Sequence, residues 1–209
     1  MRRFTIFIFL ILLFFSCEQA EETRYACESC CCVESDSGLF SSLEECWDAC
    51  LPEPSTIPEV MVTVFLYENC PIAQYMCGPL RDAYRYFCDT LNQDFVFRGF
   101  SPNSFSTNSS IADFIIDYDI PFNISIDYNH NANIPGLYTQ NYLPSVTPEI
   151  FIEINGELVY KGMIDNSYQE LGEWSPPTQN FLSNILTDFI NQEEIVYFET
   201  DAVGCLINY

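Results

Sequence analysis

The residues best suited to chemistry in this chain are Cys70 and Pro71, which follow an apolar run from Val60 to Leu66. That run predicts a strand buried on both faces. Pro71 suits the first position of a helix, where a missing N–H is tolerated, so Cys70 is expected at the helix N-terminus. A thiol there faces unpaired backbone N–H groups and the positive end of the helix dipole, which both stabilise a thiolate. We therefore predict a reactive cysteine, although the charge of Glu68 opposes its ionisation.

Two further cysteines follow in the same predicted helix, which is expected to kink at Gly78-Pro79. Cys77 lies two turns beyond Cys70, about 10 Å away by helical rise, which is too far for a disulfide. Cys77 and Cys88 share the apolar stripe of the helix, and we interpret both as buried free cysteines that act as small hydrophobes. A structural disulfide that involves either one is the alternative.

The composition indicates an acidic globular protein with a substantial core. The 209 residues include 7 Lys and Arg against 30 Asp and Glu, a formal net charge of -23, and 48% of residues are apolar. Such a charge repels phosphate groups, so we expect no nucleic-acid partner. The length suits one core domain and a small accessory module.

The first residues predict export. Arg2 and Arg3 precede an apolar stretch over residues 4–15 that is too short to span a bilayer comfortably. The stretch ends at Cys17 and resembles a loose bacterial lipobox, so we predict a signal peptide over 1–16, lipidation of Cys17 and a tether over 17–26. Ordinary cleavage near Ser16 is the alternative, because Phe15 replaces the usual small residue. The expected location is the cell envelope, on the periplasmic or surface face of a bacterial membrane, with the lipid anchor as the membrane contact.

Residues 27–51 form a cysteine-rich module, followed by a proline-rich linker over 52–58. So short a module needs covalent support, and export favours disulfides over a zinc site, although the cysteine spacing also suits zinc. The sequence does not choose among the possible pairings. The predicted structural disulfides involve six residues: Cys27, Cys30, Cys31, Cys32, Cys46 and Cys50.

The remainder is predicted to form a main domain over 59–195 and a tail over 196–209. A helix capped by Ser109 or Ser110 and a final helix from about Thr178 are expected, together with a loop over 167–177. The strands are expected at 94–100 and 122–127, and in a hairpin of 149–154 and 158–164 that turns at Asn155-Gly156. This order predicts an α/β protein with a mixed sheet and helices on both faces.

Four short motifs follow in order on the predicted elements: Cys70-Pro71-Ile72-Ala73-Gln74, Ser145-Val146-Thr147-Pro148-Glu149, Gly162-Met163-Ile164-Asp165 and Ala202-Val203-Gly204-Cys205. Through these motifs, the chain from about Pro58 to Tyr209 resembles the redoxin group of thioredoxin-fold proteins, which includes thioredoxins and peroxiredoxin-like proteins. The resemblance implies a thioredoxin-like mixed sheet flanked by helices, beside the small N-terminal disulfide-rich module. It also implies that Pro148 is a cis-proline beside the reactive cysteine and that Thr147 offers its backbone to a substrate chain.

The chain departs from the group at several positions. Ala73 stands where a thioredoxin has its second cysteine, and relatives with the Cys-Pro-Ile-Ala motif resemble this chain in their Val-Gly-Cys ending. We hypothesise that Cys70 and Cys205 form a redox pair, or a stable disulfide that pins the tail over the site. Tyr67 stands where peroxiredoxins have Thr or Ser, which argues against peroxide reduction. His130 lies in an Asn-rich loop and is interpreted as solvent-facing, so copper delivery is not supported, and we expect no metal and no cofactor.

These observations predict an exported thiol–disulfide oxidoreductase with Cys70 as its nucleophile. Its expected partner is the thiol or disulfide of a protein or a small molecule. The alternative is a non-catalytic binding lipoprotein of the cell envelope with the same fold. Titration of the native thiols distinguishes the two, because only the oxidoreductase requires an accessible, ionised Cys70.

Overall fold

The computed structural model describes residues 24–28, 31–35, 38–42, 45–46 and 59–208. Its contacts divide the chain into two units, Met1–Leu51 and Pro52–Tyr209. The predicted signal peptide, Cys17 and the proline-rich linker lie outside the described residues. Within the described part of the chain, no helix has the length and apolar composition needed to cross a membrane.

The N-terminal unit contains an antiparallel pair of strands, β1 (Tyr25–Glu28) and β2 (Cys31–Glu34). A disulfide joins Cys32 in β2 to Cys46, with their Cα atoms 6.0 Å apart. This bond supports the interpretation of the module as disulfide-rich, since it uses two of the sulfurs that a zinc site would need. Cys30 and Cys50 lie outside the described residues, while Cys27 and Cys31 are described by their backbone in the strand pair.

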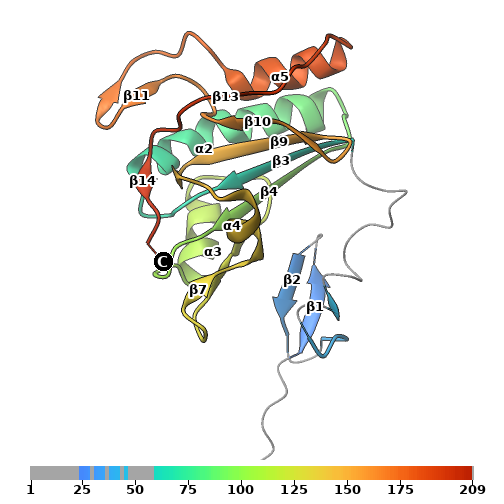
Figure 1. Ribbon diagram of the computed structural model, residues 1–209, viewed down its shortest axis with the longest axis vertical. Helices are drawn as coiled ribbons and strands as arrows, with labels where there is room; N and C mark the ends of the chain where they lie inside the picture. The colour runs from blue at the N-terminus through green and yellow to red at the C-terminus, as the bar shows by residue number, and fades with distance from the viewer. Residues whose placement is uncertain (1–23, 29–30, 36–37, 43–44, 47–58, 209) are drawn as a thin grey trace, which may run out of the picture. The chain divides into compact units, whose positions relative to one another are not determined.

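The main unit is built on a six-stranded mixed sheet (Figure 1). The strands β3, β4 and β5 are parallel, while β9 runs antiparallel to both β3 and β10, and β13 is parallel to β10. The apolar run after residue 59 is therefore a central strand, with a neighbour on each side, as predicted. The spatial order is β13 (Phe198–Glu199), β10 (Glu157–Gly162), β9 (Glu149–Ile154), β3 (Val60–Phe65), β4 (Phe95–Ser101) and β5 (Ile124–Ile126).

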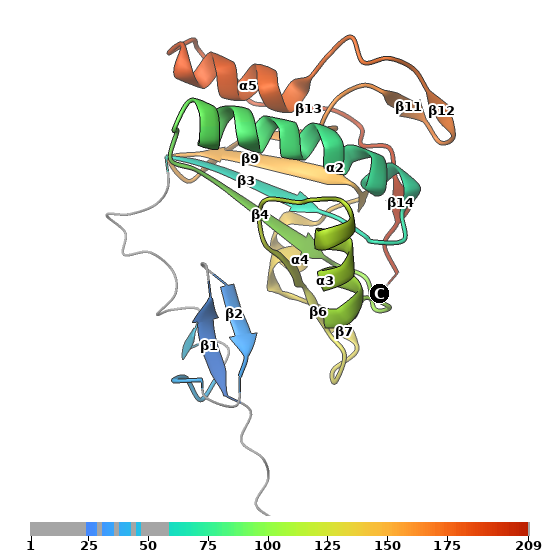
Figure 2. The ribbon, with the colours of Figure 1, turned by 180° about the vertical axis from the view of Figure 1, so that it is seen from behind.

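Helices cover both faces of this sheet (Figures 1 and 2). The long helix α2 (Pro71–Tyr84) continues into a π-helical turn over Arg85–Thr90 and lies on the same face as α5 (Phe181–Ile190). Aromatic contacts place both helices on this face: Tyr84 of α2 contacts Phe97, and Phe189 of α5 contacts Phe95, two residues apart on the strand β4.

The opposite face of the sheet is covered by the short helix α4 (Leu137–Tyr142). Tyr142 packs against Phe65 and Phe151, and Tyr138 stacks on Phe100 with ring centroids 4.0 Å apart. The sequence analysis did not predict α4, because six residues are too few to show a helical period.

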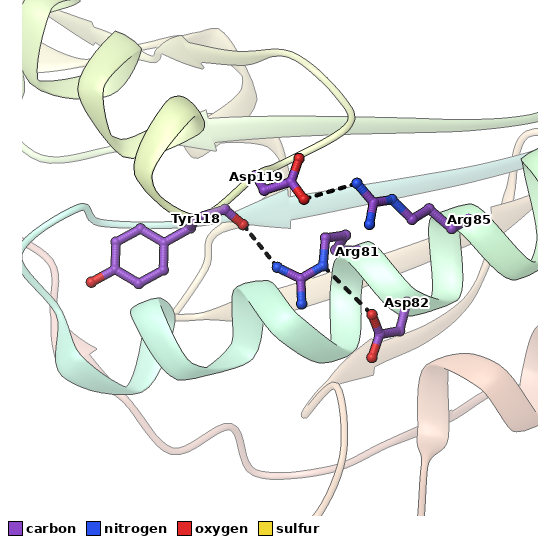
Figure 3. A network of polar contacts seen from close by, with 5 residues as sticks. All are labelled: Arg81, Asp82, Arg85, Tyr118 and Asp119. Atoms are coloured by element: carbon purple, nitrogen blue, oxygen red, sulfur yellow. Dashed lines mark hydrogen bonds and ion pairs between the residues drawn. The ribbon is translucent and has the colours of Figure 1, made fainter.

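Helix α3 (Asn108–Asp117) packs beside α2, as a right-handed connection between parallel strands requires (Figure 3). Arg81 of α2 donates a hydrogen bond to the carbonyl oxygen of Tyr118 at 3.2 Å, and Arg85 forms an ion pair with Asp119 at 2.8 Å. Arg81 also lies 3.5 Å from Asp82 on its own helix. These contacts join the outer side of α2 to the end of α3.

Two local predictions were wrong. The N-cap of α3 is Thr107, and Ser110 is the third helical residue, since each side chain accepts a hydrogen bond from the backbone N–H of the other. The expected loop over 167–177 contains the strand pair β11 (Tyr168–Glu170) and β12 (Glu173–Trp174). Its glycine and prolines were read as breaking regular structure, but Gly172 supplies the positive φ that the connecting turn needs.

The central strand β9 allows a test of the core. Ile152 has no exposed surface and lies opposite Val62. We expect Ile152→Ala to lower the free energy of unfolding by about 2–5 kcal/mol, because it leaves a cavity that the sheet cannot close. The control Ile116→Ala removes a side chain that is 75% exposed, and we expect a change within about 0.5 kcal/mol. Urea denaturation measures both, and equal losses would contradict the assignment of the core.

Candidate functional site

Cys70 occupies the N-cap of α2, directly after β3 and a turn. Its N–H donates to the carbonyl oxygen of Tyr67 at 2.9 Å, and its own carbonyl accepts the N–H of Gln74 at 2.9 Å, which is the first turn of the helix. Pro71 is the first helical residue, where it needs no hydrogen bond. The predicted placement at a helix N-terminus after a central strand is therefore present.

The sulfur of Cys70 is bonded to that of Cys205, 135 residues further along the chain. The two Cα atoms are 5.8 Å apart, within the ordinary range for a disulfide. Cys70 has no exposed surface, whereas Cys205 is partly exposed. The pairing that the sequence analysis hypothesised is thus found, while the catalytic role of the pair stays a prediction.

The Thr147–Pro148 peptide bond lies beside this pair and is cis. The short strand β8 (Val146–Thr147) pairs antiparallel with β14 (Cys205–Leu206), so that Cys205 lies opposite Thr147. The sulfur of Cys70 is 3.1 Å from the carbonyl oxygen of Thr147. After reduction, the thiol of Cys70 is placed to donate to this carbonyl. That bond favours the protonated thiol and opposes the effect of the helix N-terminus.

The turn that carries Cys70 is fixed by the buried carboxylate of Glu68. Its two oxygens accept hydrogen bonds from the hydroxyls of Ser110 at 2.6 Å and Ser106 at 2.8 Å, at the beginning of α3. The charge of Glu68 therefore has its own partners, which the sequence analysis missed because they lie about 40 residues away.

The C-terminal tail is held at two further points. A Cβ atom at Gly204 would overlap the carbonyl oxygen of Thr147, so the tail approaches β8 more closely than any other residue type would allow. Four positions later, the N–H of Asn208 donates to the side-chain oxygen of Asn103 at 2.8 Å, and its carbonyl accepts from Ser104 at 2.9 Å. The sequence offered no signal for Asn103, because nothing local connects it with the tail.

Two polar groups at this site are buried without a hydrogen-bond partner among the described residues. They are the hydroxyl of Thr147 and the side-chain amide nitrogen of Asn103. Both residues are fully buried, and both contact the tail through their other groups.

The other described cysteines of the main unit are free. Burial raises the pKa of the Cys77 thiol to about 12, and the thiol donates to the carbonyl oxygen of Ala73 at 3.1 Å. Burial, with the nearby charge of Asp89 adding to it, raises the pKa of Cys88 to about 11. Both are free, as predicted, but only Cys77 is buried, whereas Cys88 is half-buried at the edge of the core.

The single histidine lies away from these groups. His130 is exposed, as predicted, and its ring meets that of Tyr128 with centroids 5.2 Å apart. Among the described residues, no three or more His, Cys, Asp or Glu side chains gather as a metal site would require.

No protein-family model matches the sequence, and no curated protein matches it either. Solved structures do match. A hypothetical protein from Sinorhizobium meliloti is 17% identical with a TM-score of 0.59, and the match covers 73% of this chain and 80% of that one. An uncharacterised conserved protein from Geobacillus kaustophilus is 16% identical with a TM-score of 0.60, covering 73% of this chain and 78% of that one. A thiol-disulfide isomerase from Corynebacterium glutamicum is more distant, at 15% identity and a TM-score of 0.45, covering 66% and 83%.

At such identities the likeness concerns the fold alone. The main unit has a thioredoxin-like fold, with a mixed sheet flanked by helices, Cys70 at the start of the helix after a central strand, and a cis-proline beside it. The expected fold class is confirmed, together with disulfide bonding in the small N-terminal unit.

The burial of the free thiols predicts which cysteines react. At pH 8 a pKa of about 12 or 11 leaves only about one thiolate in ten thousand or in one thousand, so Cys77 and Cys88 should label very slowly, and faster as the pH rises. Mild reduction should make Cys70 and Cys205 reactive, whereas guanidinium chloride should be needed to expose Cys77, and the half-buried Cys88 should label faster than Cys77 without it. Alkylation followed by mass spectrometry of the peptides assigns each thiol. A bond from Cys205 to Cys77 or Cys88 would contradict the arrangement.

Proposed function

We propose that this protein is a thiol–disulfide oxidoreductase whose redox pair is Cys70 and Cys205. The observation that carries the proposal is the disulfide between a cysteine at a helix N-terminus and a cysteine on the C-terminal tail, directly beside a cis-proline. A helix N-terminus stabilises a thiolate, which helps a cysteine that must ionise but gives no advantage to a disulfide that only holds the chain together.

The exchange proceeds in two displacements. The thiolate of Cys70 attacks a partner disulfide, a bond forms between Cys70 and one partner sulfur, and the other partner sulfur leaves as a thiolate that takes up a proton. The thiolate of Cys205 then attacks the sulfur of Cys70, which restores the internal disulfide and releases the second partner thiol. The partner gains two electrons and two protons, and a dithiol reductant returns the internal pair to its reduced form. In the opposite direction, one thiolate of a partner dithiol attacks the partly exposed sulfur of Cys205, and Cys70 leaves as a thiolate. The second partner thiolate then displaces Cys205, so that the partner leaves as a disulfide.

The division of roles follows from the surroundings of each sulfur. Cys70 has the N-terminus of α2 to stabilise its thiolate, and Cys205 lies on a two-residue strand without a helix. Cys77 and Cys88 are poor nucleophiles near neutral pH, because their raised pKa values keep them protonated. Thr147 and Pro148 are the proposed contacts of the partner, since they lie beside the disulfide and against the tail at Gly204 and Cys205.

The proposed setting is the cell envelope. Residues 1–16 would be removed as a signal peptide, and Cys17 would carry the lipid that holds the protein to a bacterial membrane through the tether 17–26. The module 27–51 and the linker 52–58 would then separate the membrane from the domain 59–195 and its tail 196–209. An oxidising compartment suits both the module and the Cys70–Cys205 bond.

A non-catalytic binding protein is the second candidate. One observation favours it: Cys70 has no exposed surface while bonded to Cys205, as expected of a disulfide that only secures the tail. In that case, the bond would resist mild reductants and the native protein would show no reactive thiol from this pair.

Reduction of insulin disulfides by dithiothreitol tests the proposal. Wild-type protein should accelerate the reaction, and Cys70→Ser should lower the accelerated rate by about a hundredfold or more, because no nucleophile replaces the thiol. Cys205→Ser should retain the first displacement and accumulate a mixed disulfide, visible by mass spectrometry. Cys88→Ser is the matched control and should stay within about twofold of wild type. Wild-type protein that adds nothing to the rate of dithiothreitol alone would favour the binding protein.

A further inference from the structure

The tail behaves as a peptide seated in a binding site. Its strand β14 completes a two-stranded ladder with β8, and β8 has no other strand partner in the described part of the chain. Adding a strand to an open edge is a general way to bind an extended polypeptide, with backbone hydrogen bonds supplying affinity and side-chain fit supplying selectivity.

At the edge of β8, the tail fits against the strand through two residues. Gly204 lies against the carbonyl oxygen of Thr147, where a Cβ atom would overlap that oxygen, and Cys205 follows directly. The next residue, Leu206, is 75% exposed and contributes little. Recognition at this edge therefore uses the backbone, a glycine and the cysteine after it.

The tail also blocks the site. Cys70 has no exposed surface, so no partner sulfur can reach it while the tail lies on β8. Once the tail leaves, the backbone edge of Val146 and Thr147 lacks its ladder partner, and two buried polar groups, the Thr147 hydroxyl and the Asn103 amide, remain without a partner.

We propose that residues 203–208 are an internal mimic of the partner, and that opening the Cys70–Cys205 bond makes the β8 edge available to an extended polypeptide with a Gly-Cys sequence. This inference rests on the proposed function, because thiol–disulfide exchange opens the bond. Residues 202–208 carry no charged side chain in a chain of net charge -23, so the partner segment is expected to be uncharged as well. The partner class is thus a polypeptide thiol or disulfide, with the small-molecule thiols as the competing outcome.

The test uses a fluorescent peptide, Ala-Val-Gly-Ser-Leu-Ile-Asn, which copies residues 202–208 with serine in place of the cysteine so that binding is not covalent. Its anisotropy is measured with oxidised wild-type protein and with the full-length double variant Gly204→Val, Cys205→Ser, whose own tail cannot dock. We expect binding to the double variant, and binding to oxidised wild type weaker by about a hundredfold or more, because the tethered tail competes at high effective concentration. A control peptide with valine for glycine should bind the double variant about tenfold more weakly or worse.

Equal binding of the two peptides, or equal binding to oxidised wild type and the double variant, would overturn the inference. Hydrogen exchange gives a second measurement that needs no variant: in wild-type protein, amides of 203–208 should lose protection on reduction, and unchanged protection would also overturn it. The two proposals fail separately. If Cys70 is reactive but the peptide does not bind, this inference is wrong and the protein is an oxidoreductase of small thiols. If the peptide binds but Cys70→Ser leaves the insulin-reduction rate unchanged, the β8 edge is a binding site and the proposed redox function is wrong.

Discussion

The bond between Cys70 and Cys205 brings the N-terminus of α2 and the C-terminal tail together at one point. Because 135 residues separate the two cysteines, the chain-entropy account attributes about 5 kcal/mol of stabilisation to closing this loop. The bond has direct structural consequences, since it covers Cys70 and holds the tail against Thr147. In the bonded state, Cys70 is therefore covered and the tail occupies the edge of β8.

The surroundings of the pair separate it from the other thiols. Cys70 lies at the N-terminus of α2 and Cys77 lies seven residues further along the same helix, and both are buried. The N-terminus of α2 favours ionisation of a thiol at Cys70 and the carbonyl oxygen of Thr147 opposes it, whereas burial raises the pKa values of Cys77 and Cys88. Disulfide exchange requires a thiolate, so the raised pKa values disfavour Cys77 and Cys88 as its nucleophiles.

Apart from its disulfide bond to Cys70, the tail is held by few contacts. Beyond Cys205 it is held by the hydrogen bonds of Asn208 with Asn103 and Ser104, and its side chain at Leu206 is exposed. A segment with few buried apolar contacts opens at low free energy once its covalent link is gone. Such a segment suits repeated closing and release, whereas a segment packed into the core would not.

By itself, the sequence determined the elements whose physics is local. Three predicted elements depend on neighbouring residues alone, and each is present: the strand that begins at Val60, the helix that begins at Pro71 and the hairpin at Asn155-Gly156. The resemblance carried by short motifs supplied the cis-proline and the remote cysteine. Only the tertiary structure decided three contacts of the site: the carbonyl of Thr147 beside Cys70, the serine hydroxyls that bind Glu68, and the side chain of Asn103 that binds the tail at Asn208. These contacts join residues about 40 to more than 100 positions apart, and a local pattern carries no information about which distant backbone group will lie opposite a given side chain.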